Sequence, residues 1–246
     1  MKTSTKLILA IAIVATVSLA IYDMLLRQAY VKGDYNNPYR DYASLDFKNF
    51  TAIDLDASTV ANIIVKQGPF SIKIDPYSAG FVRVTQNKGI LHIKAAFNRG
   101  YTNEMASYIL IITCPKIDSI TTDSRYMANG KQVTDSLASW DFMFRPSVIS
   151  GFTEDSLSIV ENHAGNLILS GNNIKSVKAA IGIGDKCRSN IIITDDNKFQ
   201  NAHLDILNYS QLQLHNAHIN NLKYLLADSA KLIQYGGTPN ILKKQN

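Results

Sequence analysis

The chain has 246 residues, enough for one or two domains with a sizeable hydrophobic core. Its 25 basic and 20 acidic residues give a formal net charge of +5, but the lysines and arginines are scattered along the sequence. Nucleic-acid-binding proteins normally gather such an excess into a patch with aromatic residues, so we expect no nucleic-acid partner. The two cysteines, Cys114 and Cys187, are too few for a disulfide scaffold and predict buried thiols, although the sequence leaves open whether they pair.

The N-terminus contains a hydrophobic segment. Residues 7–26 would form twenty helical residues, a length of about 30 Å that matches the hydrocarbon core of a bilayer. Lys2 and Lys6, within the preceding residues 1–6, favour a cytoplasmic N-terminus. We therefore predict a transmembrane anchor. A cleavable signal peptide is the alternative, because residues 18–20 (Ser-Leu-Ala) fit a cleavage site. Both alternatives place the rest of the chain in the periplasm or the extracellular space.

The remainder divides into a tether and one long β domain. Residues 27–46 are polar and rich in tyrosine, without periodicity, which is typical of a tether. From residue 47 to residue 243 apolar and polar residues alternate with period two, the pattern of strands that bury one face. The first alternating pairs are Ile53/Leu55, Ile63/Val65, Ile72/Ile74, Val82/Val84 and Leu91/Ile93. Turn-forming residues separate them, so we predict an all-β domain.

The C-terminal third of the domain repeats. Leu204 and Leu212 are followed by Tyr224 and Leu232 at a spacing of 20 residues, and only the unit around residues 177–200 is longer, apparently extended near residues 182–186. Two short strands and asparagine-rich turns in each 20-residue unit predict a β-solenoid, in which each unit is one coil stacked on the last. Stacked asparagines can form ladders inside such a coil, and asparagine tolerates the left-handed backbone of tight corners.

The two ends of the β domain resemble a known family. The matching motifs are Phe50/Ile53, Asn62/Val65, Gln67-Gly68 and Ile72/Ile74 at the start, and residues 226–232 followed by Tyr235-Gly236-Gly237-Thr238-Pro239 at the end. They are similar to those of the auto-transporter adhesin head GIN domain family, over roughly residues 47–243. The resemblance implies a β-helical envelope protein with a name that suggests adhesion. It implies no catalytic or binding residues.

Residues 133–156 break the repeat and contain the only tryptophan. Trp140, Phe142 and Phe144 alternate, so an extended chain would place them on one side, beside Arg145. One interpretation is a segment that fills the core or caps the stack. The other is a protruding loop that contacts a glycan or an envelope protein, since long loops on rigid scaffolds often carry function.

Other polar residues are better explained by structure. His203, His215 and His218 would point to solvent, so we expect no metal site. The acidic and basic residues that a carbohydrate-active enzyme would need fall in or beside expected turns: Asp185, Arg188, Asp195, Asp196 and Asp205.

The sequence therefore predicts a non-catalytic adhesion or scaffolding protein of the cell envelope, without cofactors. The membrane is its expected partner through the N-terminal helix. A glycan-binding module is the alternative, and a carbohydrate-active enzyme is the third hypothesis.

Overall fold

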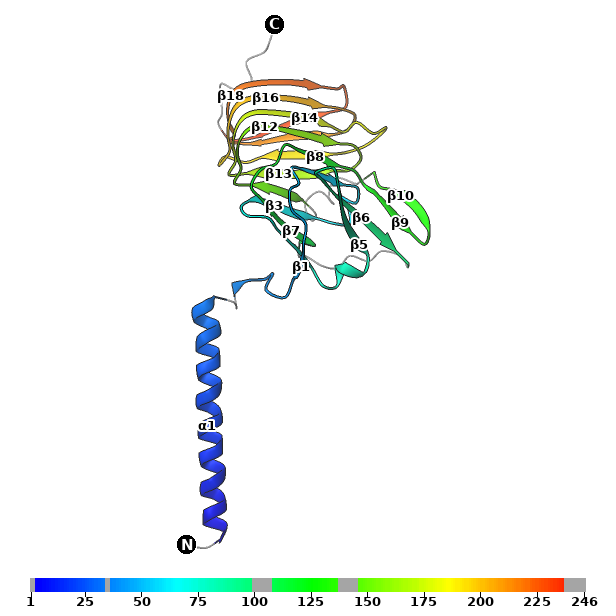
Figure 1. Ribbon diagram of the computed structural model, residues 1–246. Coiled ribbons are helices and arrows are strands. Elements are labelled where there is room, and N and C mark those ends of the chain that lie inside the picture. The colour runs from blue at the N-terminus through cyan, green and yellow to red at the C-terminus, as the bar shows by residue number, and fades with distance from the viewer. Residues whose placement is uncertain (1–2, 34–35, 99–107, 137–145, 237–246) are drawn as a thin grey trace. The chain divides into compact units, whose positions relative to one another are not determined.

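The structure, a computed structural model, describes residues 3–33, 36–98, 108–136 and 146–236 (Figure 1). Residues 1–42 and residues 43–246 form separate units. The first unit contains the helix α1 (Thr3–Lys32), which is long and apolar enough to cross a membrane. The expected apolar helix is thus present, and it continues beyond residue 26. Its length and composition fit a membrane anchor and a signal sequence alike.

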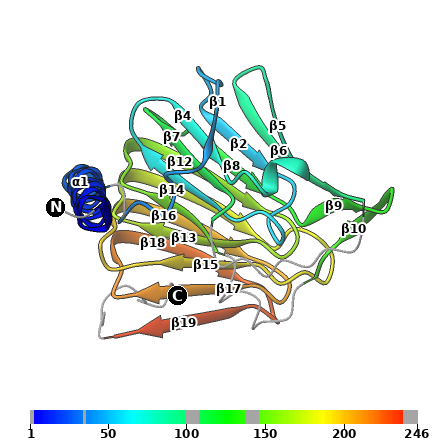
Figure 2. The same ribbon diagram turned by 90° about the horizontal axis from the view of Figure 1, so that it is seen from below.

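The second unit consists of two large β-sheets (Figure 2). Sheet A contains, in spatial order, β1 (Ala43–Leu45), β4 (Ser71–Ile74), β7 (Leu110–Cys114), β3 (Ile63–Gln67), β11 (Ser147–Ser150), β13 (Asn166–Ser170), β15 (Asn190–Ile193), β17 (Gln211–His215) and β19 (Lys231–Tyr235). Sheet B contains β10 (Lys131–Thr134), β9 (Arg125–Ala128), β6 (Ile90–Phe97), β2 (Ala52–Leu55), β8 (Ser119–Thr122), β12 (Thr153–Glu161), β14 (Asn173–Ile181), β16 (Lys198–Ile206) and β18 (His218–Leu226). An additional strand, β5 (Val82–Asn87), pairs with β6, and a short 3₁₀ helix, η2 (Ser78–Gly80), precedes it.

Strand pairing differs between two parts of this unit. From β11 to β19 the chain alternates between the sheets, and each strand pairs in parallel with the strand two places later. We call residues 146–236 the parallel half. Residues 43–134, the mixed half, combine parallel pairs with the antiparallel pairs β1–β4, β4–β7, β5–β6 and β9–β10. The all-β prediction is confirmed, but one continuous solenoid over residues 47–243 is not, because the sheets are mixed.

The repeat seen in the sequence corresponds to the register of the parallel half. Thr153 lies opposite Asn173, Asn173 opposite Lys198 and Lys198 opposite His218, which gives steps of 20, 25 and 20 residues. The long step contains residues 182–189, between β14 and β15, where the sequence predicted an extension. Because every strand keeps its register, chemically equivalent positions form straight columns across the sheets.

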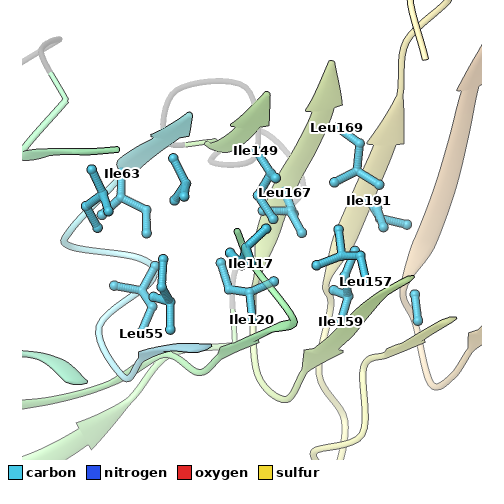
Figure 3. Packing of buried hydrophobic residues seen from close by; sticks show 14 of the residues in the cluster. Leu55, Ile63, Ile117, Ile120, Ile149, Leu157, Ile159, Leu167, Leu169 and Ile191 are labelled. Carbon is cyan, nitrogen blue, oxygen red and sulfur yellow. The ribbon is translucent and has the colours of Figure 1, made fainter. Parts of the chain in front are cut away.

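The core lies between the two sheets. Inward side chains of sheet A, such as Ile63, Ile149 and Leu169, face those of sheet B, such as Ile120 and Leu157 (Figure 3). All five are at most 1% exposed. A buried leucine or isoleucine contributes roughly 1.5–3 kcal/mol, so the column of apolar residues is the main source of stability. Leu204, Leu212 and Leu214 are buried as the repeat predicted, and Leu232, in the last turn of the stack, is partly exposed.

Polar ladders close the corners of the stack. Asn172 Nδ2 donates to Asn197 Oδ1 at 3.0 Å, and Asn190 Nδ2 donates to Asn166 Oδ1 at 2.9 Å. All four side chains are buried, and buried amides must be hydrogen-bonded to be tolerated. The expected asparagine ladders are therefore confirmed. Asn208 and Asn216 adopt the left-handed backbone conformation, with φ of 51° and 48°.

Candidate functional site

The sequence-predicted contact residues, Trp140, Phe142, Phe144 and Arg145, lie outside the described part of the chain, so they remain a prediction. Both flanks of their segment are strands. Val133 belongs to β10, and residues 147–150 form β11, which lies between β3 and β13. Phe152 is 0% exposed. The interpretation of residues 133–156 as a protruding loop is therefore wrong for residues 147–156, because β11 fills a place in sheet A, Phe152 fills the core and β12 begins at Thr153.

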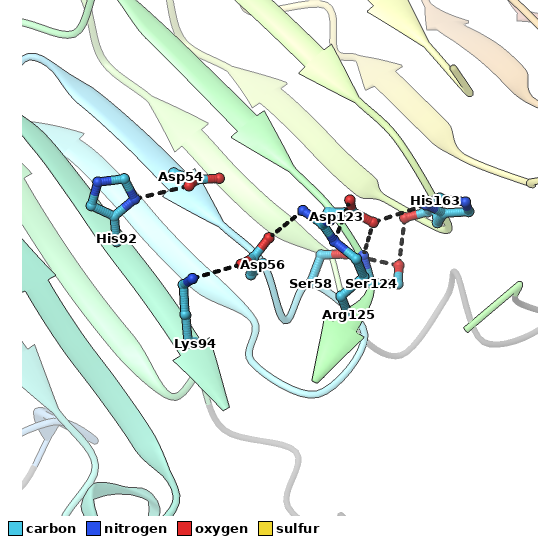
Figure 4. A network of polar contacts seen from close by, with 9 residues as sticks. All are labelled: Asp54, Asp56, Ser58, His92, Lys94, Asp123, Ser124, Arg125 and His163. Carbon is cyan, nitrogen blue, oxygen red and sulfur yellow. Dashed lines mark hydrogen bonds and ion pairs between the residues drawn. The ribbon is translucent and has the colours of Figure 1, made fainter. Parts of the chain in front are cut away.

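A network of charged side chains lies where the mixed half meets the parallel half (Figure 4). Asp123 forms an ion pair with Arg125 Nε at 2.8 Å and a second pair with His163 Nδ1 at 3.0 Å. Arg125 also reaches Asp56 at 2.9 Å, and Asp56 lies 3.3 Å from Lys94 Nζ. Because Asp123 is only 3% exposed, this pairing is needed to keep its charge inside the protein.

This network resembles a catalytic triad in composition but not in geometry. The hydroxyl of Ser124 donates to the backbone oxygen of His163, rather than to its ring. Gly184 packs directly against the ring nitrogen Nε2 of His163 and leaves no room for a side chain there. A serine nucleophile needs a base within hydrogen-bond reach, and the ring does not offer one to Ser124. The network instead joins β2, β8 and the loop after β12.

A buried carboxyl lies beside the network. Glu161, at the end of β12, points into the core in the same column as Thr122, Ile181 and Ile206. It is 0% exposed, and neither its carboxyl oxygens nor the Thr122 hydroxyl has a hydrogen-bond partner among the described residues. Burial raises the pKa of Glu161 well above its ordinary value, so the side chain is neutral over a wider pH range than an exposed glutamate.

A polar groove runs across the N-terminal ends of four neighbouring strands of sheet B. Two adjoining hollows, of about 340 and 440 Å³, share Asn173 and Gln200. We call them together the amide groove. The residues that line it come from β12, β14, β16 and β18: Thr153, Glu154, Asp155, Asn173, Lys175, Lys198, Phe199, Gln200, His218 and Asn220. They recur at the same position of successive strands, so the register of the repeat builds the groove.

The strands expose consecutive residues at this point. In β16, Gln200 and Asn201 both face solvent, whereas Phe199 and Ala202 are buried. The same pattern occurs in β18, where Asn220 and Asn221 are exposed between Ile219 and Leu222. Two outward residues in succession interrupt the period of two and mark a bend, which makes room for the groove.

Charges of both signs flank the amides. Lys175 Nζ lies 2.6 Å from Asp155 Oδ1, and this hydrogen bond lowers the pKa of Asp155 and raises that of Lys175. Burial raises the pKa of Glu154 at the same end. Lys198 and His218, opposite each other at the other end, make no ion pair among the described residues. The groove can therefore donate and accept hydrogen bonds with little net charge.

The other sequence-predicted residues are not brought together. Asp185 lies in the loop after β14, Asp196 in the turn after β15, where it accepts from Ser170 Oγ at 2.7 Å, and Asp205 on the outer face of β16. His203 and His218 are exposed as expected, whereas His215 is partly buried and its ring lies 4.5 Å from that of Tyr235. In the described ranges no three His, Cys, Asp or Glu side chains are arranged to hold a metal ion.

Both cysteines are buried and free, so the expected buried thiols are confirmed and no bridge joins them. Burial raises the pKa of Cys114 to about 12, which makes it a poor nucleophile. Neither cysteine lines the amide groove.

Sequence reasoning missed the amide groove, although the signal was present. Asp155, Lys175, Gln200 and Asn220 stand at equivalent positions of successive units, with the 25-residue step between Lys175 and Gln200. An alignment of the outward-facing positions of successive units identifies this column of four residues. The network around Asp123 had no such signal, because it depends on contacts between distant parts of the chain.

No family model and no curated protein matches the sequence. Solved structures with some similarity include a candidate adhesin from Bacteroides fragilis, with 10% identity over 79% of this chain and 96% of that chain, at a TM-score of 0.40. A candidate adhesin from Parabacteroides distasonis shares 10% identity over 79% of this chain and 94% of its own, at a TM-score of 0.37. A candidate lipid binding protein from the same species shares 10% identity over 80% and 96%, at 0.28. Such weak similarities identify neither a family nor a ligand, so the resemblance to the GIN domain family remains a prediction.

Proposed function

We propose that the chain is a non-catalytic cell-envelope protein, anchored by α1, whose β domain outside the cytoplasmic membrane serves adhesion or scaffolding. In this proposal residues 146–236 act as a short parallel solenoid of the adhesin-head type. The solenoid presents the amide groove to a polar macromolecule. The observation that carries the proposal is the groove itself, which aligns polar side chains of different kinds at equivalent positions of four strands.

A glycan is the ligand class that fits this groove best. Asn173, Gln200 and Asn220 each offer an amide with donors and an acceptor, which matches the donor and acceptor character of sugar hydroxyls. Gln200 and Asn220 occupy equivalent positions on neighbouring strands, which lie about 4.8 Å apart, so these two amides can meet successive units of an extended polymer. The paired charges of Asp155 and Lys175 favour a polymer of low charge.

A glycan array tests the groove. The full chain, held in nanodiscs, should bind neutral or weakly charged glycans. Replacing Asn173, Gln200 and Asn220 together by alanine should abolish this signal, because the amides would be lost while the fold remains. The control is the double variant Asn201→Ala and Asn221→Ala, which removes an exposed amide pair outside the groove. Equal glycan binding by the triple variant and the native chain would overturn the proposal.

The anchor has its own test. If α1 is retained, the protein should remain in the membrane fraction after washes with high salt and with alkali. The helix exposes apolar side chains along its length, which a bilayer would cover. A soluble mature chain that begins at Ile21 would instead show that the helix is a cleaved signal sequence.

A further inference from the structure

A cavity lies at the end of the mixed half, between the free edges of the two sheets. It measures about 400 Å³, within the usual range for small-ligand sites. The strand β1 forms one wall and β5 the other; among the described strands, β1 pairs with β4 alone and β5 with β6 alone. Both strands lie at the same end of the domain in Figures 1 and 2. In residues 36–98, 108–136 and 146–236 no further strand closes the core at this end.

Apolar side chains and polar groups both line the cavity. Its large apolar side chains are Leu45, Phe47, Ile74, Phe81, Val82 and Val84. Leu45, Phe47, Phe81 and Val84 are only partly buried, so apolar surface remains accessible to a ligand. Apolar surface of this kind gains free energy when a hydrocarbon covers it.

One cationic side chain, that of Arg83, also lines this cavity. Arg83 makes no ion pair among the described residues. Directly opposite Arg83 in the antiparallel pair β5–β6 lies Lys94, and like charges in that position repel. Lys94 is neutralised by Asp56, at 3.3 Å.

The acidic groups near the walls are already engaged. Asp46 pairs with Lys48 at 3.1 Å, and Asp75 accepts hydrogen bonds from Ser78. Arg83 therefore lacks a counterion that the neighbouring strands could supply.

We propose that this cavity binds one fatty acid, whose hydrocarbon tail covers the apolar walls and whose carboxylate binds the Arg83 guanidinium. An arginine fork suits a carboxylate because it donates two parallel hydrogen bonds. The source of the fatty acid is the bilayer, a point that rests on the proposed anchoring by α1. Leu45, on one wall of the cavity, follows the last residue of α1 closely in the sequence, so the chain tethers the cavity to the proposed anchor.

Photocrosslinking of the full chain in zwitterionic nanodiscs tests this inference. The probe is a long-chain fatty acid with a diazirine on its tail, and the crosslinked residues are mapped by mass spectrometry. We expect crosslinks in two places, on α1 from probe dissolved in the bilayer and on residues 45–84 from probe in the cavity. The crosslinks on α1 serve as the internal standard. An amine probe with the same tail should label α1 equally and the cavity much less.

Two variants complete the test. Arg83→Gln should lower cavity labelling relative to α1 by about tenfold, because a charge-assisted hydrogen bond is lost. The control Arg188→Gln removes an exposed arginine far from this cavity in the sequence and should change nothing. Labelling confined to α1, or cavity labelling equal for the acid and amine probes, would overturn the inference. Loss of labelling on α1 would instead contradict the anchoring, so the two failures are distinguishable.

Discussion

The mixed half and the parallel half build one core by different means. In the parallel half each strand repeats the one two places before it, and buried amide ladders hold the corners in register. In the mixed half the neighbours of a strand come from distant parts of the chain, and charged pairs such as Arg125–Asp56 join them. The parallel half is therefore joined by neutral hydrogen bonds that repeat from strand to strand, whereas the mixed half is joined by individual ion pairs.

Leu212→Asp should break the parallel half most severely. Leu212 is 0% exposed between Ile191 and Leu232, so the variant buries an unpaired charge and should cost roughly 4 kcal/mol or more. Thermal unfolding and hydrogen exchange should show the loss first in β15, β17 and β19. Leu225→Asp is the matched control, because Leu225 is 53% exposed. An unchanged melting temperature for Leu212→Asp would show that the register is wrong.

Asn172→Ala should weaken the corner ladder. The Asn172 side chain accepts a hydrogen bond from the Phe152 amide at 3.0 Å and donates to the Ile149 carbonyl and to Asn197, each at 3.0 Å. Its loss leaves buried backbone groups unpaired, which should cost about 2–3 kcal/mol in chemical denaturation. Asn201→Ala, on the solvent side of β16, should have little effect. Equal effects of the two variants would mean that the ladder contributes no stability.

Asp123→Ala should weaken the contact between the halves. It removes the partner of His163 and one of the two partners of Arg125. Since Arg125 and His163 are partly exposed, we expect a loss of about 1–2 kcal/mol rather than the larger cost of a fully buried pair. Hydrogen exchange should increase at β8 and β9 but not at β17. The control, Asp155→Ala, breaks a solvent-exposed pair and should leave stability unchanged. Faster exchange throughout the domain would contradict a local role.

Glu161→Ile should stabilise the same contact, because isoleucine stands at the equivalent positions 181 and 206. The raised pKa means that folded protein holds the proton of Glu161 more tightly than unfolded chain does. The native side chain therefore costs stability increasingly as the pH rises above the ordinary glutamate pKa, and the cost disappears below it. The gain should be about 1 kcal/mol at neutral pH and should shrink in acid. The change in stability caused by Thr122→Val should not depend on pH, because this substitution removes no titrating group.

Much of the architecture was accessible from the sequence, because alternation and repetition are local signals. The pairs Ile53/Leu55 and Leu91/Ile93 lie in β2 and β6, and the long unit after residue 177 is the 25-residue register step. Partner choice was not accessible. Nothing in the alternation of Ile72/Ile74 shows that β4 runs antiparallel to β7. Likewise, the sequence around Glu161 is that of a strand that ends in a polar residue. The Glu161 side chain is buried because it stacks between Thr122 and Ile181 of the neighbouring strands.

The loop at residues 182–186 is an insertion that the stack accommodates without a change of register. The 25-residue step places this loop between β14 and β15, yet β14 and β16 remain paired from Asn173 opposite Lys198 to Ile181 opposite Ile206. Ile183, Asp185 and Lys186 are exposed, whereas Cys187 and Ser189 are buried again. A peptide epitope inserted between Asp185 and Lys186 keeps Gly184 hydrogen-bonded to Asn208, so it should leave both flanking turns intact. The fold thus contains a natural display position for engineering.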